Sequence, residues 1–276
     1  MEGVTPQQLL ETPDLIAVGV AGDDVRRRMR GTKTTFLRVF EVHVDAPLSA
    51  LPPRVSAGEF RIVGRPTTLE ATVAAVQATV PLAAGVPVTL SSVSDLQSIP
   101  GGLTEACEAL RAAGLTGVAQ LPIDLLPNAE GAIRAIRDAG LTLLTMVVET
   151  LEDAERMAIC ERARALQETV GGFKAFAPLP RRISLAQPTT GYDDIKQVAL
   201  ARVMVSNVPS IQVDWALYGP KLAQVALTVG ADDVDNVAAV DPGILGTRRS
   251  PLEEIRGNIR AAFLEPVERD AMFEEL

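Results

Sequence analysis

The residues of this chain that could do chemistry are few, and the first is its only histidine, His43. Alternation along the predicted strand around it places His43 on the same face as Glu41 and Asp45. This would permit a weak histidine–carboxylate group at the carboxyl end of the strand. A lone histidine cannot form a metal site without further ligands. His43 is therefore a candidate ligand-binding residue, and a structural histidine is the alternative.

Arginines and the only tryptophan follow other predicted strands. Arg65 comes after the second strand and the Arg181-Arg182 pair after the sixth, so these side chains could converge. Guanidinium groups suit the recognition of carboxylates, and solvated surface arginines are the alternative. Trp215 lies at the carboxyl end of the seventh predicted strand. Its indole could stack on an aromatic ligand or simply plug the space between the strands.

A third group of candidates lies near the end of the chain. Asp232, Asp233 and Asp235 form a close acidic cluster beside the start of a predicted strand. Such a cluster is typical of a solvated turn, but a buried aspartate is costly unless it holds a partner. Lys221 lies in the first turn of a predicted helix, where free N–H groups and the lysine could bind a carboxylate. An exposed lysine is the alternative.

The two cysteines predict no metal site. Cys107 and Cys160 both lie in helical patterns, 53 positions apart, which is neither a metal-ligand spacing nor a disulfide framework. We interpret them as small apolar side chains on helix faces.

Strands and helices alternate along most of the chain, and this pattern must position the candidate residues. The predicted strands are 34–44, 60–63, 86–90, 117–121, 141–148, 173–177, 210–216 and 234–240, and the predicted helices lie near 67–80, 101–113, 128–139, 150–168, 191–206, 219–229 and 251–263. Strands with few polar residues, separated by helices, indicate a parallel sheet covered by helices.

Eight such units predict an α/β fold of the (βα)8 TIM type, with an open doubly wound sheet as the alternative. The predicted organisation is an N-terminal helical extension at 1–30, the barrel at 31–250 and a C-terminal helix and tail at 251–276. The first crossover is degenerate, because the Pro52-Pro53 pair argues against a helix between 44 and 60. No phosphate-binding glycine motif follows any strand.

Composition limits the partners. The 276 residues include 47% hydrophobic ones and carry a net charge of −9, which argues against binding nucleic acid or an anionic membrane surface. No apolar run reaches the roughly 18 residues that span a bilayer. The acidic amino terminus lacks the basic region of a secretory signal. We therefore expect a cytoplasmic protein.

Several segments, in the right order, resemble one enzyme family. They are TPDLIAVGVAGDDVRRRMRGTKTTF, AERMAICERARALQETVGGFKAFAPL, TTGYDDIKQVALARVMVSNVPSIQVDWALYGPKLAQVALTVGADDVDN and the closing PVERDAMF. They are similar to aminofutalosine synthases, radical S-adenosylmethionine enzymes of menaquinone synthesis. The resemblance implies a barrel with a substrate pocket near Trp215.

The resemblance fails where the cofactor should be held. A cluster of this family needs three thiolates in a C-x3-C-x2-C motif, and the chain offers Pro47-Leu48 and a proline-rich loop there. Arg65 stands where the family has the second glycine of a pair, and 118–124 lacks the family's glycine-rich turn. We therefore expect no iron–sulfur cluster, no other metal or cofactor, and weak or no binding of S-adenosylmethionine.

Two functions are compatible with these observations. The first is a cluster-free homologue that acts in menaquinone (futalosine) synthesis as a non-radical binding protein, for a small carboxylated ligand, or as a heteromeric partner of an active radical synthase. The alternative is an enzyme of non-radical chemistry on a carboxylated aromatic or futalosine-like substrate in the barrel mouth. Whether the chain is an enzyme stays open at this point.

Overall fold

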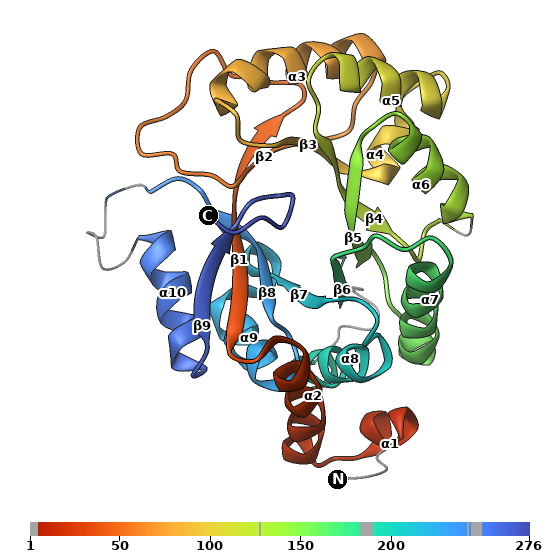
Figure 1. Ribbon diagram of the computed structural model, residues 1–276, viewed down its shortest axis with the longest axis vertical. Coiled ribbons are helices and arrows are strands. Elements are labelled where there is room, and N and C mark those ends of the chain that lie inside the picture. Colours follow the sequence, from red (N-terminus) through yellow and green to blue (C-terminus); the bar gives the residue numbers. More distant parts are fainter. Residues whose placement is uncertain (1–4, 127, 183–189, 242, 244–249) are drawn as a thin grey trace.

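The strands form a closed parallel barrel (Figure 1). The computed structural model describes residues 5–126, 128–182, 190–241, 243 and 250–276. Their strands are β1 (Lys33–His43), β2 (Glu59–Val63), β3 (Val88–Ser92), β4 (Gly117–Pro122), β5 (Thr142–Val148), β6 (Ala175–Pro180), β7 (Ser210–Asp214), β8 (Asp233–Ala238) and β9 (Glu265–Arg269). Strands β2 to β8 pair in chain order, and β1 closes the ring by pairing with both β8 and β2. The predicted barrel is confirmed, and this closure excludes an open sheet.

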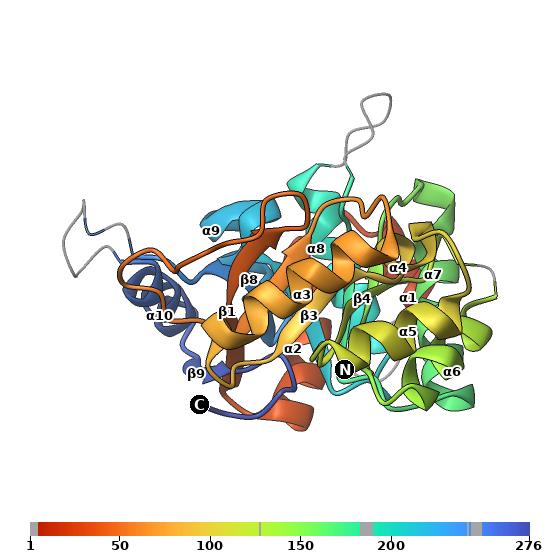
Figure 2. The same ribbon diagram turned by 90° about the horizontal axis from the view of Figure 1, so that it is seen from above.

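Helices surround the barrel, as Figures 1 and 2 show. They are α1 (Pro6–Glu11), α2 (Leu15–Arg30), α3 (Leu69–Ala83), α4 (Val93–Ser98), α5 (Leu103–Ala112), α6 (Ala129–Asp138), α7 (Arg156–Thr169), α8 (Gly191–Met204), α9 (Trp215–Val229) and α10 (Pro251–Ala261). The main hydrophobic core lies between the outer face of the barrel and these helices, and it includes Phe36, Phe40 and Val42 of β1. The alternate β1 residues face the lumen.

Helices α1 and α2 precede the barrel and pack against its outer layer. Both contact α8, and Leu9, Val18 and Ala199 form a small second core there. The first crossover, residues 44–58, contains no helix, as the proline pair predicts. None of the helices in the described ranges is both long and apolar enough to cross a membrane.

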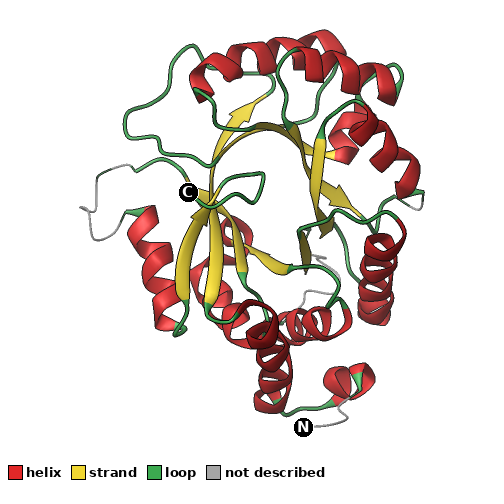
Figure 3. Cartoon of the chain, in the orientation of Figure 1, coloured by secondary structure: helices red, strands yellow, loops and turns green. Residues whose placement is uncertain are grey.

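The C-terminal segment differs from the prediction of a helix followed by a tail. After α10 the chain forms β9, which pairs in parallel with the first half of β1, whereas β2 pairs with the second half. Strand β9 therefore fills the place beside β1 that β2 leaves free. The remaining residues cross the amino-terminal end of the barrel, inside the ring of strands in Figure 3. The sequence of β9 is too short for its alternating pattern to predict a strand when the pairing with β1 is unknown.

Two other local differences affect the site. The seventh strand ends at Asp214, so Trp215 begins helix α9 instead of ending a strand. Helix α9 is interrupted at Gly219, whose φ of 72° and ψ of 168° suit only glycine. Strand β8 carries a bulge where its register with β1 shifts, and Asn236 there has a φ of 62°. Bulges of this kind often lie beside functional sites.

Candidate functional site

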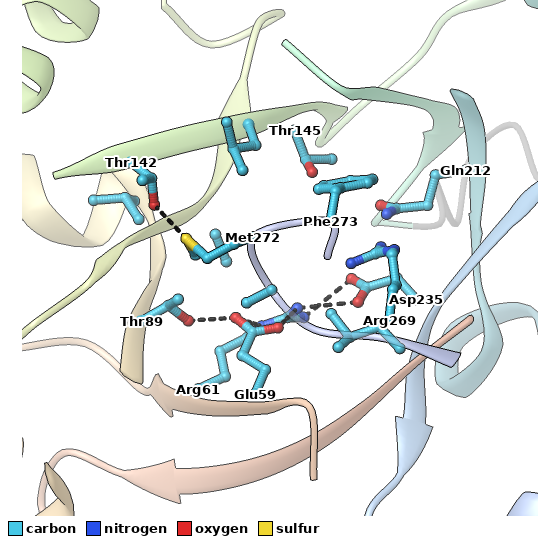
Figure 4. A pocket seen from close by; sticks show the side chains of 15 residues that line it. Glu59, Arg61, Thr89, Thr142, Thr145, Gln212, Asp235, Arg269, Met272 and Phe273 are labelled. Carbon is cyan, nitrogen blue, oxygen red and sulfur yellow. Dashed lines mark hydrogen bonds and ion pairs between the residues drawn. The ribbon is translucent and has the colours of Figure 1, made fainter. Parts of the chain in front are cut away.

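The middle of the barrel lumen is filled by an ion-pair network (Figure 4). The Arg61 guanidinium donates to both carboxylate oxygens of Asp235, at 3.0 and 3.1 Å, and its Nε donates to Glu59 at 3.1 Å. The Thr89 hydroxyl donates to the same glutamate. All four side chains are buried. Burial alone would raise the pKa of Asp235, but the adjacent Arg61 lowers it below the ordinary range.

The amino-terminal end of the lumen is closed by a second network around Asp233. Arg269 donates to both of its carboxylate oxygens at 2.7 Å, Gln212 donates to Oδ2 at 2.7 Å, and the Thr35 hydroxyl donates to Oδ1. The Phe273 ring covers the Arg269 guanidinium, with 3.8 Å from its carbon to the ring centroid. Asp233, a predicted binding residue, thus lies opposite the mouth with its carboxylate fully paired.

Asp232, the neighbouring predicted binding residue, lies just before β8 and is also far from the mouth. Its carboxylate is completely buried and lies 2.8 Å from Arg202 and 3.5 Å from Arg30. It also accepts a hydrogen bond from the backbone of Ile211 at 3.0 Å. Burial raises the pKa of Asp232 to about 6, against the effect of the two arginines. The structure therefore gives Asp232 a place between the barrel and helices α2 and α8.

At the carboxyl end of the strands, Asp214 organises the mouth. One oxygen caps helix α9 by accepting the Leu217 N–H at 2.9 Å, and the other accepts from Arg181 at 3.1 Å. Asp214 is the register partner of Asp235, and burial together with that carboxylate raises the pKa of Asp214. Asp214 is not among the binding residues predicted from the sequence. Its role as an N-cap was hidden, because the predicted strand extended to residue 216 and the predicted helix began only at residue 219.

Three of the other predicted residues, His43, Arg65 and Lys221, are exposed around the mouth. His43 ends β1, and Lys221 lies in α9; neither side chain bonds to another described residue. Arg65 follows β2 and is also exposed. Burial raises the pKa of Asp95 in α4, and Arg65 opposes this effect, which places the arginine near that carboxyl. The structure thus brings Arg65 and Arg181 to the same end of the barrel, where Arg181 is already paired with Asp214.

Trp215 borders a hollow at this end. The hollow has a volume of about 560 Å³ and a mostly apolar lining between β1, β8 and the start of α9. Trp215, Glu41, Asn236, Gly219 and Val240 are among its lining residues. The Gly219 break and the Asn236 bulge both shape its wall. A hollow of this size could accept a small molecule.

The cysteines do not fit the iron–sulfur cluster that the family resemblance implies. Cys107 and Cys160 are fully buried in α5 and α7, in the helical layer outside the barrel. Burial raises the pKa of Cys107 to about 11 and that of Cys160 to about 12, so both stay protonated. Within the described residues, no group of three or more His, Cys, Asp or Glu side chains could hold a metal ion.

Comparison with known proteins agrees with the barrel. Residues 172–275 match the model of the CofH/MqnC C-terminal region. The structure resembles HydG, a maturase of the [FeFe]-hydrogenase, with a TM-score of 0.61, 14% identity and coverage of 96% of this chain and 72% of HydG. It also resembles methylornithine synthase PylB, with a TM-score of 0.61, 13% identity and coverage of 96% and 94%. At these identities, the structural matches show the fold alone.

Curated relatives give the sequence relationship. Aminodeoxyfutalosine synthase of Thermus thermophilus is 37% identical over 171 residues, 54% of this chain and 45% of the relative. Cyclic dehypoxanthine futalosine synthase of Streptomyces coelicolor is 30% identical over 197 residues, 62% and 49% of the two chains. The matched region thus spans less than half of each relative. The chain is therefore a homologue of the radical S-adenosylmethionine enzymes that include aminodeoxyfutalosine synthase, CofH and MqnC, and it contains only two cysteines.

Proposed function

We propose that this chain is a non-radical binding protein related to menaquinone (futalosine) synthesis, with its ligand site at the carboxyl end of the barrel. The observation that carries the proposal is the position of the two cysteines. Both thiols are buried in outer helices, so the chain cannot present three thiolates at the mouth. The link to menaquinone synthesis is supported by the sequence similarity to futalosine synthases.

The mouth retains a place for a ligand although it lacks cluster ligands. Binding sites in barrels of this type are built from the loops after the strands. The hollow beside Trp215 lies at that end and is large enough for a small organic molecule. Its position is set by a glycine break and a β-bulge, which are costly features for a purely structural strand end.

Anaerobic reconstitution with iron and sulfide tests the non-radical character. We expect no stoichiometric iron after desalting and no absorbance band of a [4Fe–4S] cluster, with an intact aminodeoxyfutalosine synthase as the positive control. A stable cluster on this chain would overturn the proposal.

The partner form of the proposal is supported by exposed apolar side chains on the same rim. Leu125 follows β4, Tyr192 begins α8 after β6, and Leu217 lies in the first turn of α9, with exposures of 45%, 66% and 46%. We propose that this rim contacts an active radical synthase. A tagged chain should then co-purify with that synthase, and Leu217→Asp should abolish the interaction while Val225→Asp, on the same helix, preserves it. Failure of the tagged wild-type chain to capture the synthase would contradict this form.

The enzymatic alternative is supported by one observation, the raised pKa of Asp214 at the mouth. Asp214 could exchange a proton with a ligand, because Asn236, which donates to its carboxylate, lines the neighbouring hollow. Menaquinone-pathway extracts incubated with the protein should then show a changed metabolite that is lost with Asp214→Asn. The variant Arg65→Ala tests whether the substrate carries a carboxylate, because Arg65 forms no hydrogen bond or ion pair with another described residue. An unchanged metabolite profile with the wild-type protein would reject the alternative.

A further inference from the structure

We infer that the hollow beside Trp215 binds an organic cation, an amine with an apolar body, rather than a carboxylate. This inference rests on the proposed ligand-binding function and names the chemical class of its ligand. It follows from the charge around the hollow, from one carboxylate that has no partner among the described residues, and from the composition of the wall.

The arginines of the lumen are already committed to protein carboxylates. Arg61 binds Glu59 and Asp235, Arg269 binds Asp233, and Arg181 binds Asp214. Four carboxylates thus share three guanidinium groups. A carboxylate in the hollow would therefore lie beside a lumen whose described ion pairs leave one negative charge in excess. A ligand cation would instead complete the charge balance.

Glu41 adds a further carboxylate and is directed toward the hollow. It is the register partner of Arg61 and lies on the lumen face of β1, together with Thr35 and Leu37. It lines the hollow, and its side chain is exposed. It forms no hydrogen bond or ion pair with any other described residue. Its charge is therefore available to a ligand ammonium group.

The wall beside Glu41 suits the rest of such a ligand. Trp215 is half-buried there, and an indole face attracts cations through its quadrupole. Asn236 lies at the β8 bulge and lines the hollow, and its amide donates to the Asp214 carboxylate at 3.5 Å, so a second carboxylate lies behind this part of the wall. Neither Lys221 nor His43, the two basic residues nearby in sequence, is among the described residues that line the hollow.

The test uses Trp215 as its own reporter, because the chain has no other tryptophan. The fluorescence of the full chain is titrated at neutral pH and low salt with 2-phenylethylamine, 2-phenylethanol and 3-phenylpropionate, which differ mainly in charge. We expect the amine to bind about tenfold more tightly than the alcohol or the carboxylate. Glu41→Gln should remove that advantage and leave the affinity for the alcohol unchanged.

Two further variants complete the design. Glu108→Gln removes an exposed carboxylate from α5, outside the barrel, and should leave all three affinities unchanged. Ala238→Lys places an ammonium group in the wall of the hollow and should abolish amine binding while improving carboxylate binding. Equal binding of the amine and the carboxylate, or no effect of Glu41→Gln, would overturn the cation inference while leaving ligand binding intact. Absence of binding for all three probes, checked by calorimetry, would overturn both.

Discussion

At the scale of single residues, the charged side chains inside the barrel form ion pairs that stabilise the fold. Removing a carboxylate and a guanidinium from water is expensive, and only close pairing compensates for the cost. Arg61 meets this condition with two carboxylates and Arg269 with one. Glu41 differs from these residues because its carboxylate is exposed and has no partner among the described residues. It can therefore bind a ligand.

Asp235→Asn tests this interpretation. The variant should be destabilised by about 3 kcal/mol at neutral pH, because Arg61 loses a buried partner. The pKa of Asp235 is lowered in the folded state, so its stabilisation is present above the ordinary carboxyl pKa of about 3.9 and is lost as the pH falls through the lower folded value. Denaturant unfolding at several pH values should therefore show the gap between wild type and variant narrowing in acid.

The matched control is Asp138→Asn, an exposed carboxylate at the end of α6. It should change the free energy of unfolding by less than about 0.5 kcal/mol at any of these pH values. A comparable loss in both variants would contradict a specific role for the buried pair.

At the scale of elements, the start of α9 defines the hollow. Asp214 caps the helix, Trp215 begins it, and the break at Gly219 separates the first turn from the rest. If α9 continued without the break, its first turn, including Trp215, would have a different orientation relative to the rest of the helix. The β8 bulge at Asn236 has the same effect on the opposite wall. The two irregular elements thus position the indole beside Glu41.

Gly219→Ala should destabilise the protein by about 1–3 kcal/mol, because its backbone conformation is nearly closed to other residues. No atom lies within 4 Å of an added Cβ, so the loss is conformational and not steric. Thermal unfolding measures the effect. Gly257→Ala is the control, since Gly257 lies in regular α10 with equal free space, and it should stabilise the protein by up to about 1 kcal/mol. Equal effects of the two variants would show that α9 tolerates a regular turn.

At the scale of the whole molecule, the paired charges, the hollow and the two thiols lie in three different parts of the barrel fold. Paired charges fill the lumen, the hollow lies at the carboxyl end, and both thiols lie in the outer helices. The C-terminal segment belongs to the barrel itself, because β9 pairs with β1 and Arg269 reaches Asp233. The family match extends to residue 275 and thus includes this closing segment.

The position of the thiols gives a prediction for the intact fold. A thiol reagent such as dithionitrobenzoate should find neither cysteine reactive in the native protein, because burial raises the pKa of Cys107 to about 11 and that of Cys160 to about 12. Both should react at once in guanidinium chloride. The absorbance of the released thiolate measures the number of reactive groups. A rapidly reacting thiol in the native state would contradict the buried placement.

The sequence by itself determined the alternation of strands and helices, the loop in the first crossover and the shortage of thiolates. These features depend on local periodicity, on proline chemistry and on counting, so they need no knowledge of distant contacts. The positions of the predicted binding residues were determined only in part. His43, Arg65, Arg181, Trp215 and Lys221 lie around the mouth, as their places after strands indicate, while Asp232 and Asp233 lie at the other end.

Only the tertiary structure decided which charges are paired and which are free. The partners of Asp235, Asp233 and Asp214 are Arg61, Arg269 and Arg181, which lie between 33 and 174 positions away in the chain. Such pairs are fixed by strand register and by closure of the ring, and local sequence patterns contain neither. The same closure drew β9 into the barrel and left the carboxylate of Glu41 facing an open hollow.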